Sequence, residues 1–157
     1  MAKLTDNPAR EVADAIVAHI QGLAPGLGIE AAQVRRKLDL SGNPKELAGV
    51  MVSTTDRGDH PGCVGRVLVD VGVEITAWTH LNDDADGSHC DAIAGALMAA
   101  MQTIDYALPD WHVAWRGSWS ATAPAAGDAY RAITISATLP LVRRAGGDTS
   151  TSASTQP

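Results

Sequence analysis

The sequence has few cysteines and no long apolar run, and these shortages exclude several classes of protein. Its two cysteines, Cys63 and Cys90, are too few for a disulfide framework and form no Cys-x-x-Cys pair, which favours a reducing, intracellular setting. No apolar stretch approaches the roughly 20 residues that span a bilayer, so we expect no membrane contact. The opening MAKLTDNPAREV lacks the apolar core of a signal peptide, and we therefore expect synthesis in a cytoplasm.

Positive charge is also scarce. Twelve basic residues against 18 acidic ones give a formal net charge of -6 at pH 7. The basic clusters, Arg35-Arg36-Lys37 and Arg143-Arg144, are short, whereas binding to nucleic acid requires many Lys and Arg side chains against phosphates. The charge therefore argues against sequence-specific nucleic-acid binding.

What the chain does contain is enough apolar material for one packed core. Of its 157 residues 45% are hydrophobic, which fits one ordinary domain. We expect a single α+β domain over residues 1–144. The polar, small-residue segment AGGDTSTSASTQP over 145–157 is expected to be a disordered tail.

Two helices are predicted from caps and helical spacing. The first begins after Asp6 or Asn7, has Pro8 at its first position and ends around residues 22–26. Its apolar stripe consists of Val12, Ile16, Ile20 and Leu23. The second begins at Ser88, which forms a capping-box-like pair with Asp91. Its stripe consists of Ile93, Leu97, Ala100 or Met101, and Ile104.

Alternation at period two predicts the strands. The clearest spans residues 64–79, with an inward face of Val67, Val69, Val71, Val73, Ile75 and Ala77. Gly72 in its middle suggests a bulge or bend. Further strands are expected at 34–40, 50–52, 111–119 and 129–142, with a loop at 56–63. The predicted fold is α+β: a mainly antiparallel sheet, with an N-terminal helix and a second, central helix packed on it.

The loop LNDDADGSHCDAI, residues 81–93, raises the question of a calcium site. Asn82, Asp84 and Asp86 followed by Gly87 match the opening spacing of an EF-hand loop. The twelfth position, however, is Ile93 rather than the bidentate Glu, and a strand rather than a helix precedes the loop. We interpret it instead as a helix lead-in, in which the aspartates form a polar turn, Ser88 caps, Asp91 meets the helix dipole and Cys90 faces the core.

A zinc site is the other metal hypothesis. His60 and Cys63 form a short pair, and His80, His89 or Cys90 would complete it if the loops converged. Structural zinc sites usually combine tighter paired spacings, so a Pro-Gly turn explains the pair as well.

Catalytic motifs are absent from the sequence. It contains no Gly-x-Ser-x-Gly elbow, and PGLGIE lacks the Lys of a phosphate-binding loop. We therefore expect no enzyme, no catalytic residue, no metal and no cofactor.

The tryptophans suggest a contact between subunits. Trp111, Trp115 and Trp119 share a period-two face, which fits either core packing or an interface, where aromatic residues and Arg are enriched. Arginines next to them and at the end of the last strand suit the rim of such a contact. The interface residues that we predict are Trp115, Arg116, Trp119, Arg143 and Arg144.

The second half of the chain resembles a known family. GVEITAWTHLNDDADGSHCDAIAGALMAAM, followed by WHVAWRGSW and AYRAITISATLPLV, is similar to the tail-terminator and tail-completion proteins of long-tailed bacteriophages. In those proteins a strand ending near a Trp leads through a polar loop into an Ala-rich helix, and two strands follow. The corresponding residues here are Ile75 to Trp78, Cys90 to Leu97, and Tyr130-Arg131-Ala132.

The resemblance implies a structural virion protein of the tail or neck. Such proteins form a homo-oligomeric ring, commonly a hexamer, that caps the tail tube, and their partners are the tail tube protein and head–tail connector proteins. The expected location is the virion, after assembly in the host cytoplasm. Two alternatives remain open: a small zinc-binding domain or metal-dependent enzyme using the His60/Cys63 loop, and an α+β binding domain that forms no ring.

Overall fold

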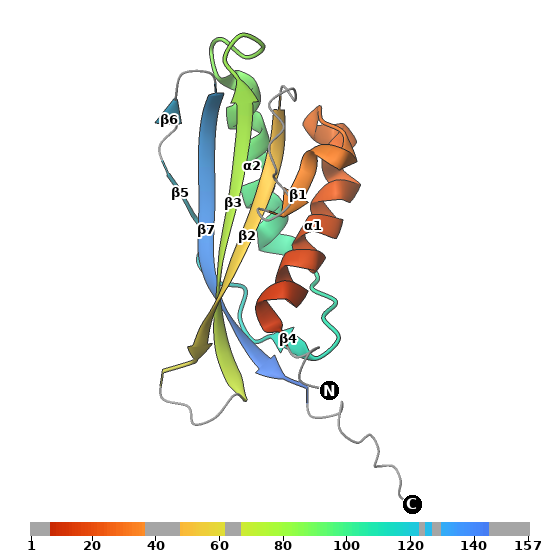
Figure 1. The fold of residues 1–157 in the computed structure, drawn as a ribbon, viewed down its shortest axis with the longest axis vertical. Helices are drawn as coiled ribbons and strands as arrows, with labels where there is room; N and C mark the ends of the chain where they lie inside the picture. Colours follow the sequence, from red (N-terminus) through yellow and green to blue (C-terminus); the bar gives the residue numbers. More distant parts are fainter. Residues whose placement is uncertain (1–6, 37–47, 62–66, 123–124, 127–129, 145–157) are drawn as a thin grey trace, which may run out of the picture.

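The computed structural model describes residues 7–36, 48–61, 67–122, 125–126 and 130–144. Within these ranges two α-helices pack on a mixed sheet (Figure 1). In chain order the elements are α1 (Pro8–Leu27), the 3-10 helix η2 (Ala31–Gln33), β1 (Val34–Arg36), β2 (Ala48–Asp59), β3 (Leu68–His80), α2 (Ser88–Thr103), β4 (Trp111–Val113), β5 (Ser120–Ala121), β6 (Ala125–Ala126) and β7 (Tyr130–Arg143).

The sheet is antiparallel except at one edge. Its order is β1-β2-β3-β7-β4, and β5 and β6 also pair with β7. Strands β3 and β7 are paired along their whole length, from Leu68↔Val142 to His80↔Tyr130. The pairing of β1 with β2 is parallel. The prediction of an α+β fold with a mainly antiparallel sheet, an N-terminal helix and a second, central helix packed on it is confirmed.

The core lies between the two helices and the inward face of the sheet. The period-two prediction for β3 is confirmed from Val69 to Ala77, whose inward side chains are buried. Val67 is 61% exposed, because the paired strand begins only at Leu68. On β7 the buried residues alternate in the same way and are Ile133, Ile135, Leu139 and Leu141.

The first helix begins as predicted but ends later. The Asn7 side chain accepts a hydrogen bond from the backbone N–H of Arg10 at 3.0 Å, and Pro8 occupies the first helical position. The expected end around residues 22–26 is wrong: the helix reaches Leu27, and the N–H of Gly28 closes it on two carbonyls of the last turn. This extra turn buries Ala24 and Leu27, and Leu23, predicted inward, is 37% exposed.

Strand β2 is much longer than the predicted strand at 50–52. It runs to Asp59 because β3 offers ladder partners as far as Asp59↔Val69, so the first part of the predicted loop at 56–63 is strand. The bulge expected at Gly72 lies on β2 instead, between Asp56 and Asp59. Of the predicted strand 34–40 the described part is β1. Residues 37–47 and the predicted tail at 145–157 lie outside the described residues.

The face of the sheet opposite the helices carries polar and aromatic side chains. On it the hydroxyls of Thr76 on β3 and Thr134 on β7 share a hydrogen bond of 2.8 Å. In Figure 1 α1 and α2 lie on the other side, and the short strands β5 and β6 line the β7 edge. Among the described residues no helix is long and apolar enough to cross a bilayer.

Candidate interface

Three of the predicted interface residues, Arg116, Arg143 and Arg144, contact residues 104–111, the segment that leads from the end of α2 to the start of β4. Nη1 of Arg116 donates hydrogen bonds to the carbonyls of Gln102 at 3.2 Å and Ile104 at 2.8 Å. Carbonyls at the end of a helix lack intrahelical partners, and the negative end of the helix dipole attracts a cation. Arg116 therefore holds the C-terminus of α2, a role that the sequence did not indicate.

The two arginines at the end of β7 hold the same segment. Nε of Arg144 donates to the carbonyls of Leu108 at 2.9 Å and Trp111 at 3.1 Å. The guanidinium of Arg143 lies 5.4 Å from the centroid of the Trp111 ring, within cation–π range. All three predicted arginines thus make intramolecular contacts, while their residues remain exposed at the surface.

The tryptophans do not share one face, so that part of the prediction is wrong. Strand β4 ends at Val113, and beyond it the chain leaves the regular ladder and turns at Gly117, where φ is +80°. Trp111 is fully buried, whereas Trp115 is 58% exposed. Trp119 packs against the core, and its Nε1 donates to the carbonyl of Arg116 at 3.0 Å. Trp115 alone among them presents a large apolar surface to solvent.

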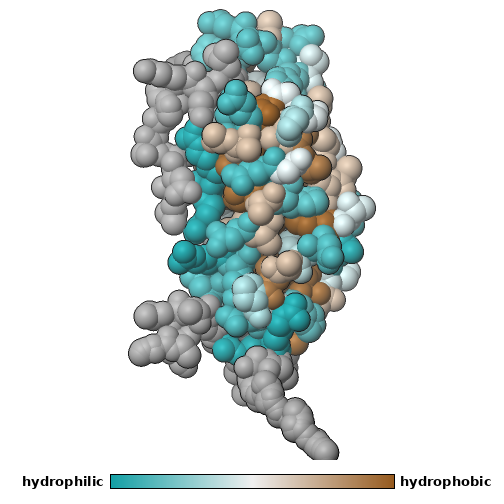
Figure 2. All heavy atoms as spheres, turned by 90° about the vertical axis from the view of Figure 1, so that its right-hand side faces the viewer, coloured by the Kyte–Doolittle hydropathy of each residue, from teal (hydrophilic) through white to brown (hydrophobic). Residues whose placement is uncertain are grey.

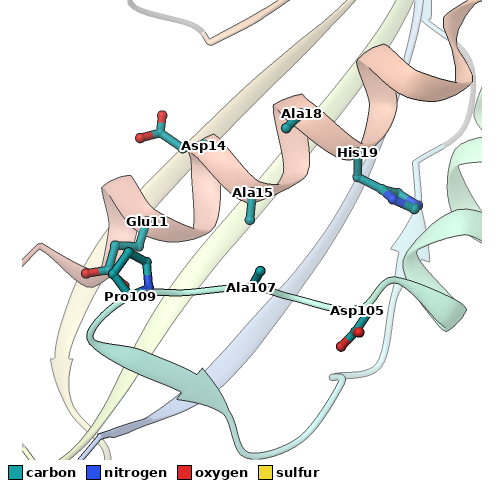
Figure 3. A pocket seen from close by; sticks show the side chains of 8 residues that line it. All are labelled: Glu11, Asp14, Ala15, Ala18, His19, Asp105, Ala107 and Pro109. Atoms are coloured by element: carbon teal, nitrogen blue, oxygen red, sulfur yellow. The ribbon is translucent and has the colours of Figure 1, made fainter. Parts of the chain in front are cut away.

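A groove lies on the other side of the 104–111 segment, between it and α1 (Figure 3). It has a volume of about 560 Å³. Ala15 on α1 and Ala107 on the segment point toward one another across it. The remaining lining residues are Glu11, Asp14, Ala18, His19, Asp105 and Pro109. In the sequence, the groove is indicated only by Ala15 and Ala18, three positions apart on one helix. Such a pair of alanines is too common to predict a groove.

The groove combines an apolar lining with carboxylates at its rim. Oε1 of Glu11 accepts a hydrogen bond from the backbone N–H of Asp110 at 3.0 Å, which ties α1 to the segment. The Asp14 carboxylate lies 3.8 Å from Arg10 Nε and 3.5 Å from Arg36 Nη1. Asp105 stands at one end of the groove opposite His19 (Figure 3). The groove is therefore suited to an apolar group from a positively charged surface.

Tyr106 belongs to this segment and faces the arginines. It lines a cavity of about 290 Å³ together with Arg116, Arg144 and His112. Burial raises the pKa of Tyr106 to about 12, against the opposing effect of the Arg116 charge. The phenol is therefore uncharged well above neutral pH, and Asp105 is the carboxylate that lines this cavity.

The acidic loop before α2 is a helix lead-in, as predicted, but its capping residue is different. Oδ1 of Asp84 accepts from the N–H of His89 at 3.0 Å, and Oδ2 accepts from the N–H of Cys90 at 2.9 Å and from the Thr79 hydroxyl at 2.9 Å. Burial alone would raise the pKa of Asp84, but these hydrogen bonds outweigh it and hold the pKa below its ordinary value. Ser88, predicted as the cap, is already the first helical residue.

His60 and His80, the two histidines of the zinc hypothesis that flank β3, lie far apart. His60 Nδ1 pairs with Asp70 Oδ1 at 2.7 Å, and its N–H donates to the Leu68 carbonyl at one end of β3. His80 is the last residue of that 13-residue strand, so about 3.3 Å per residue separates the two ends by roughly 40 Å. No group of three His, Cys, Asp or Glu suited to a metal occurs among the described residues, which do not include Cys63.

The remaining ligand candidates have structural roles. His89 Nε2 lies 3.0 Å from the Leu27 carbonyl and so joins α2 to the end of α1. Cys90 is fully buried, and burial raises the pKa of its thiol, which disfavours the thiolate that a metal or a nucleophilic reaction requires. The zinc hypothesis therefore gains no support from these side chains.

Comparison with known proteins identifies the fold and leaves the family open. No family model and no curated protein matches the sequence. The structure is similar to a solved protein with a TM-score of 0.56 and 13% sequence identity, over 86% of this chain and 94% of the other. At this identity the likeness shows the fold alone, a single α+β domain with two helices on a mixed, curled sheet.

Proposed function

We propose that the protein is a structural component of a bacteriophage virion, a tail terminator or another neck protein, that forms a ring on the end of the tail tube. It acts by binding rather than catalysis and uses no cofactor. Its partners are further copies of the same chain, commonly six in a ring, the tail tube protein and a head–tail connector protein. It is made in the host cytoplasm and resides in the tail or neck of the virion.

The observation that carries the proposal is that the three segments of the phage-protein resemblance meet in space. Residues 75–78 lie in β3, residues 90–97 in α2 and residues 130–132 at the start of β7. The rings of Trp78 and Tyr130 pack edge to face with centroids 5.3 Å apart. The residues that carry the resemblance are therefore neighbours in the folded protein, and they also occur in the same order along the chain as in the phage proteins.

A second contact within this cluster joins all three segments. The single proton of the Cys90 thiol on α2 is shared weakly between two carbonyls, that of Ala77 on β3 at 3.6 Å from the sulfur and that of Arg131 on β7 at 3.8 Å. The small, buried Cys90 therefore lets the Ala-rich helix α2 pack directly on the paired strands β3 and β7. The arrangement supports the family resemblance on which the proposed ring depends.

Electron microscopy of the untagged protein at high concentration tests the proposal. We expect closed rings of uniform diameter with a central opening, because heterologous contacts that close by rotation give rings. Fields that contain only single small particles would contradict the proposal and favour a monomeric α+β binding domain. Addition of ethylenediaminetetraacetate should leave the rings unchanged, since no metal takes part in the assembly.

A further inference from the structure

Two unlike surfaces of this chain complement one another. We propose that Trp115 of one copy inserts into the groove between α1 and residues 104–110 of the next copy, and that this contact builds the ring. The inference rests on the proposed function, because it assigns the surfaces through which copies of the chain bind one another. The first surface, here called the Trp115 knob, comprises Trp115, Arg116, Arg143 and Arg144; the second, the α1 groove, comprises Glu11, Asp14, Ala15, Ala18, His19, Asp105, Ala107 and Pro109.

The Trp115 knob is an apolar anchor on a well-supported loop. The Trp115 side chain is 58% exposed. Its neighbour Arg116 is tied to the end of α2 by two hydrogen bonds. Trp119 ties the loop from the other side through the Arg116 carbonyl. An exposed tryptophan held in place by its neighbours loses little conformational entropy on binding, and tryptophan and arginine dominate binding energy at interfaces.

The α1 groove offers a matching recess. Alanine and proline side chains line it and leave a volume of about 560 Å³, and Ala15 and Ala107 face one another across it (Figure 3). Figure 2 looks onto the side of the molecule that carries α1 and shows brown and tan side chains running down it between teal ones. An aromatic ring in such a recess buries apolar area that water would otherwise cover.

Charge complementarity identifies the occupant as a second copy. The groove lining includes the carboxylates of Glu11, Asp14 and Asp105 and contains no Lys or Arg. Asp14 is paired with Arg10 and Arg36 outside the lining, so Glu11 and Asp105 contribute most of the negative charge.

The Trp115 knob carries three exposed arginines, and Asp105, which lines both the groove and the cavity beside Arg116 and Arg144, lies at the boundary between the two surfaces. Opposite charges of this kind guide approach and fix orientation. The hydrogen bonds that Arg116 and Arg144 make within the chain go to neutral backbone carbonyls. These bonds do not cancel the positive charge, which can therefore still attract a neighbouring surface.

The geometry of the contact makes it heterologous. The knob of one copy meets the groove of another, which leaves a free groove on the first copy and a free knob on the second. Such contacts repeat until the rotation closes a ring. A mixture of two blocked variants distinguishes this arrangement from a symmetric, self-paired contact.

The experiment uses Trp115→Ala, which removes the knob, and Ala18→Arg, which fills the groove and places a positive charge in it. Ala18 is exposed on α1, so the substitution should preserve the fold, as circular dichroism and the thermal midpoint will check. Val67→Ser is the matched control, since Val67 is 61% exposed and belongs to neither surface. If Trp115→Ala lowers the thermal midpoint, Trp115→Gln replaces it.

Native mass spectrometry then reports the assemblies. We expect rings for the wild type and the Val67→Ser control, and monomers for each blocked variant, because loss of a tryptophan anchor weakens a contact by about 30-fold or more. An equimolar mixture of the two blocked variants should give one-to-one dimers, since one intact knob and one intact groove remain. Rings that persist in either blocked variant, or a mixture without dimers, would overturn this inference and leave the proposed ring intact. A wild type that stays monomeric would overturn both.

Discussion

The Thr79 hydroxyl donates a hydrogen bond to Oδ2 of Asp84 at 2.9 Å, and both side chains are buried. This bond joins the penultimate residue of β3 to the residue that caps α2. The acidic loop is thus a structural connection between the sheet and the central helix, and its carboxylate is already satisfied by three donors.

Replacement of Asp84 should destabilise the fold. Asp84→Ala leaves the hydroxyl of Thr79 and two helix N–H groups without their acceptor, and we expect a loss of about 2 kcal/mol in the free energy of unfolding. Asp84→Asn keeps one oxygen and should lose about half as much. Urea denaturation followed by tryptophan fluorescence measures both. Exposed Asp83 provides the control, since Asp83→Asn should change the unfolding free energy by less than about 0.5 kcal/mol; equal effects at 83 and 84 would contradict this role.

The Asp84 carboxylate should also make stability depend on pH in acid. Its pKa in the folded protein lies below the ordinary value of 3.8, so the unfolded chain binds the proton first as the pH falls. The contribution of this group is therefore complete above pH 3.8 and is lost as the pH falls through the lower folded pKa. Thermal midpoints from pH 5 to pH 2 should fall less steeply in Asp84→Asn. An unchanged slope would show that other groups carry the acid dependence.

The contact of Arg116 with α2 predicts a second loss of stability. Arg116→Ala removes a charged donor from the carbonyls of Gln102 and Ile104 and should reduce the free energy of unfolding by about 1 kcal/mol. Arg116→Lys retains the charge near the helix end and should recover part of that loss. Denaturation curves for the three proteins give the order wild type, Lys, Ala. If Arg116 served only an intermolecular contact, the isolated monomers would be equally stable.

Close packing at Gly49 gives a prediction with a matched glycine control. A Cβ at Gly49 would lie 2.5 Å from Cζ2 of Trp78 and 3.0 Å from the Gln33 carbonyl. Gly49→Ala should therefore cost about 1–3 kcal/mol and change the near-ultraviolet circular dichroism of the Trp78–Tyr130 pair. Gly95 on α2 has no atom within 4 Å of the corresponding position. Gly95→Ala should instead stabilise by about 0.5–1 kcal/mol. The same sign at both sites would contradict the packing argument.

Periodicity in the sequence was sufficient to predict the helices and strands whose side chains form the core. Residues 69–77 alternate strictly, and the stripe from Val12 to Ile20 repeats every four residues, because one side of each element faces the other layer. These local patterns gave the fold class and the positions of α1, β3, α2 and β7. They failed at boundaries set by tertiary contacts: β2 extends to Asp59 because β3 pairs with it, which no local property of residues 56–59 indicates.

The candidate interface was only partly accessible from the sequence. The prediction identified Trp115 and the arginines but placed the tryptophans on one face, because the end of β4 after Val113 depends on how β7 is shared among three short strands. Similarly, the capping role of Asp84 depends on its burial beneath Thr79. The α1 groove arises where residues 105–109 pass α1, a juxtaposition of segments about 90 positions apart that composition and spacing do not reveal.

Native mass spectrometry of the untagged, full-length wild type is the most direct test of the central claim, because it reports subunit number and bound metal together. The account predicts a discrete assembly near six subunits with no metal. A monomer that carries about one zinc ion would contradict it and redirect attention to the His60/Cys63 loop. A monomer without metal would also contradict it, because a chain whose own surfaces are complementary should assemble at high concentration.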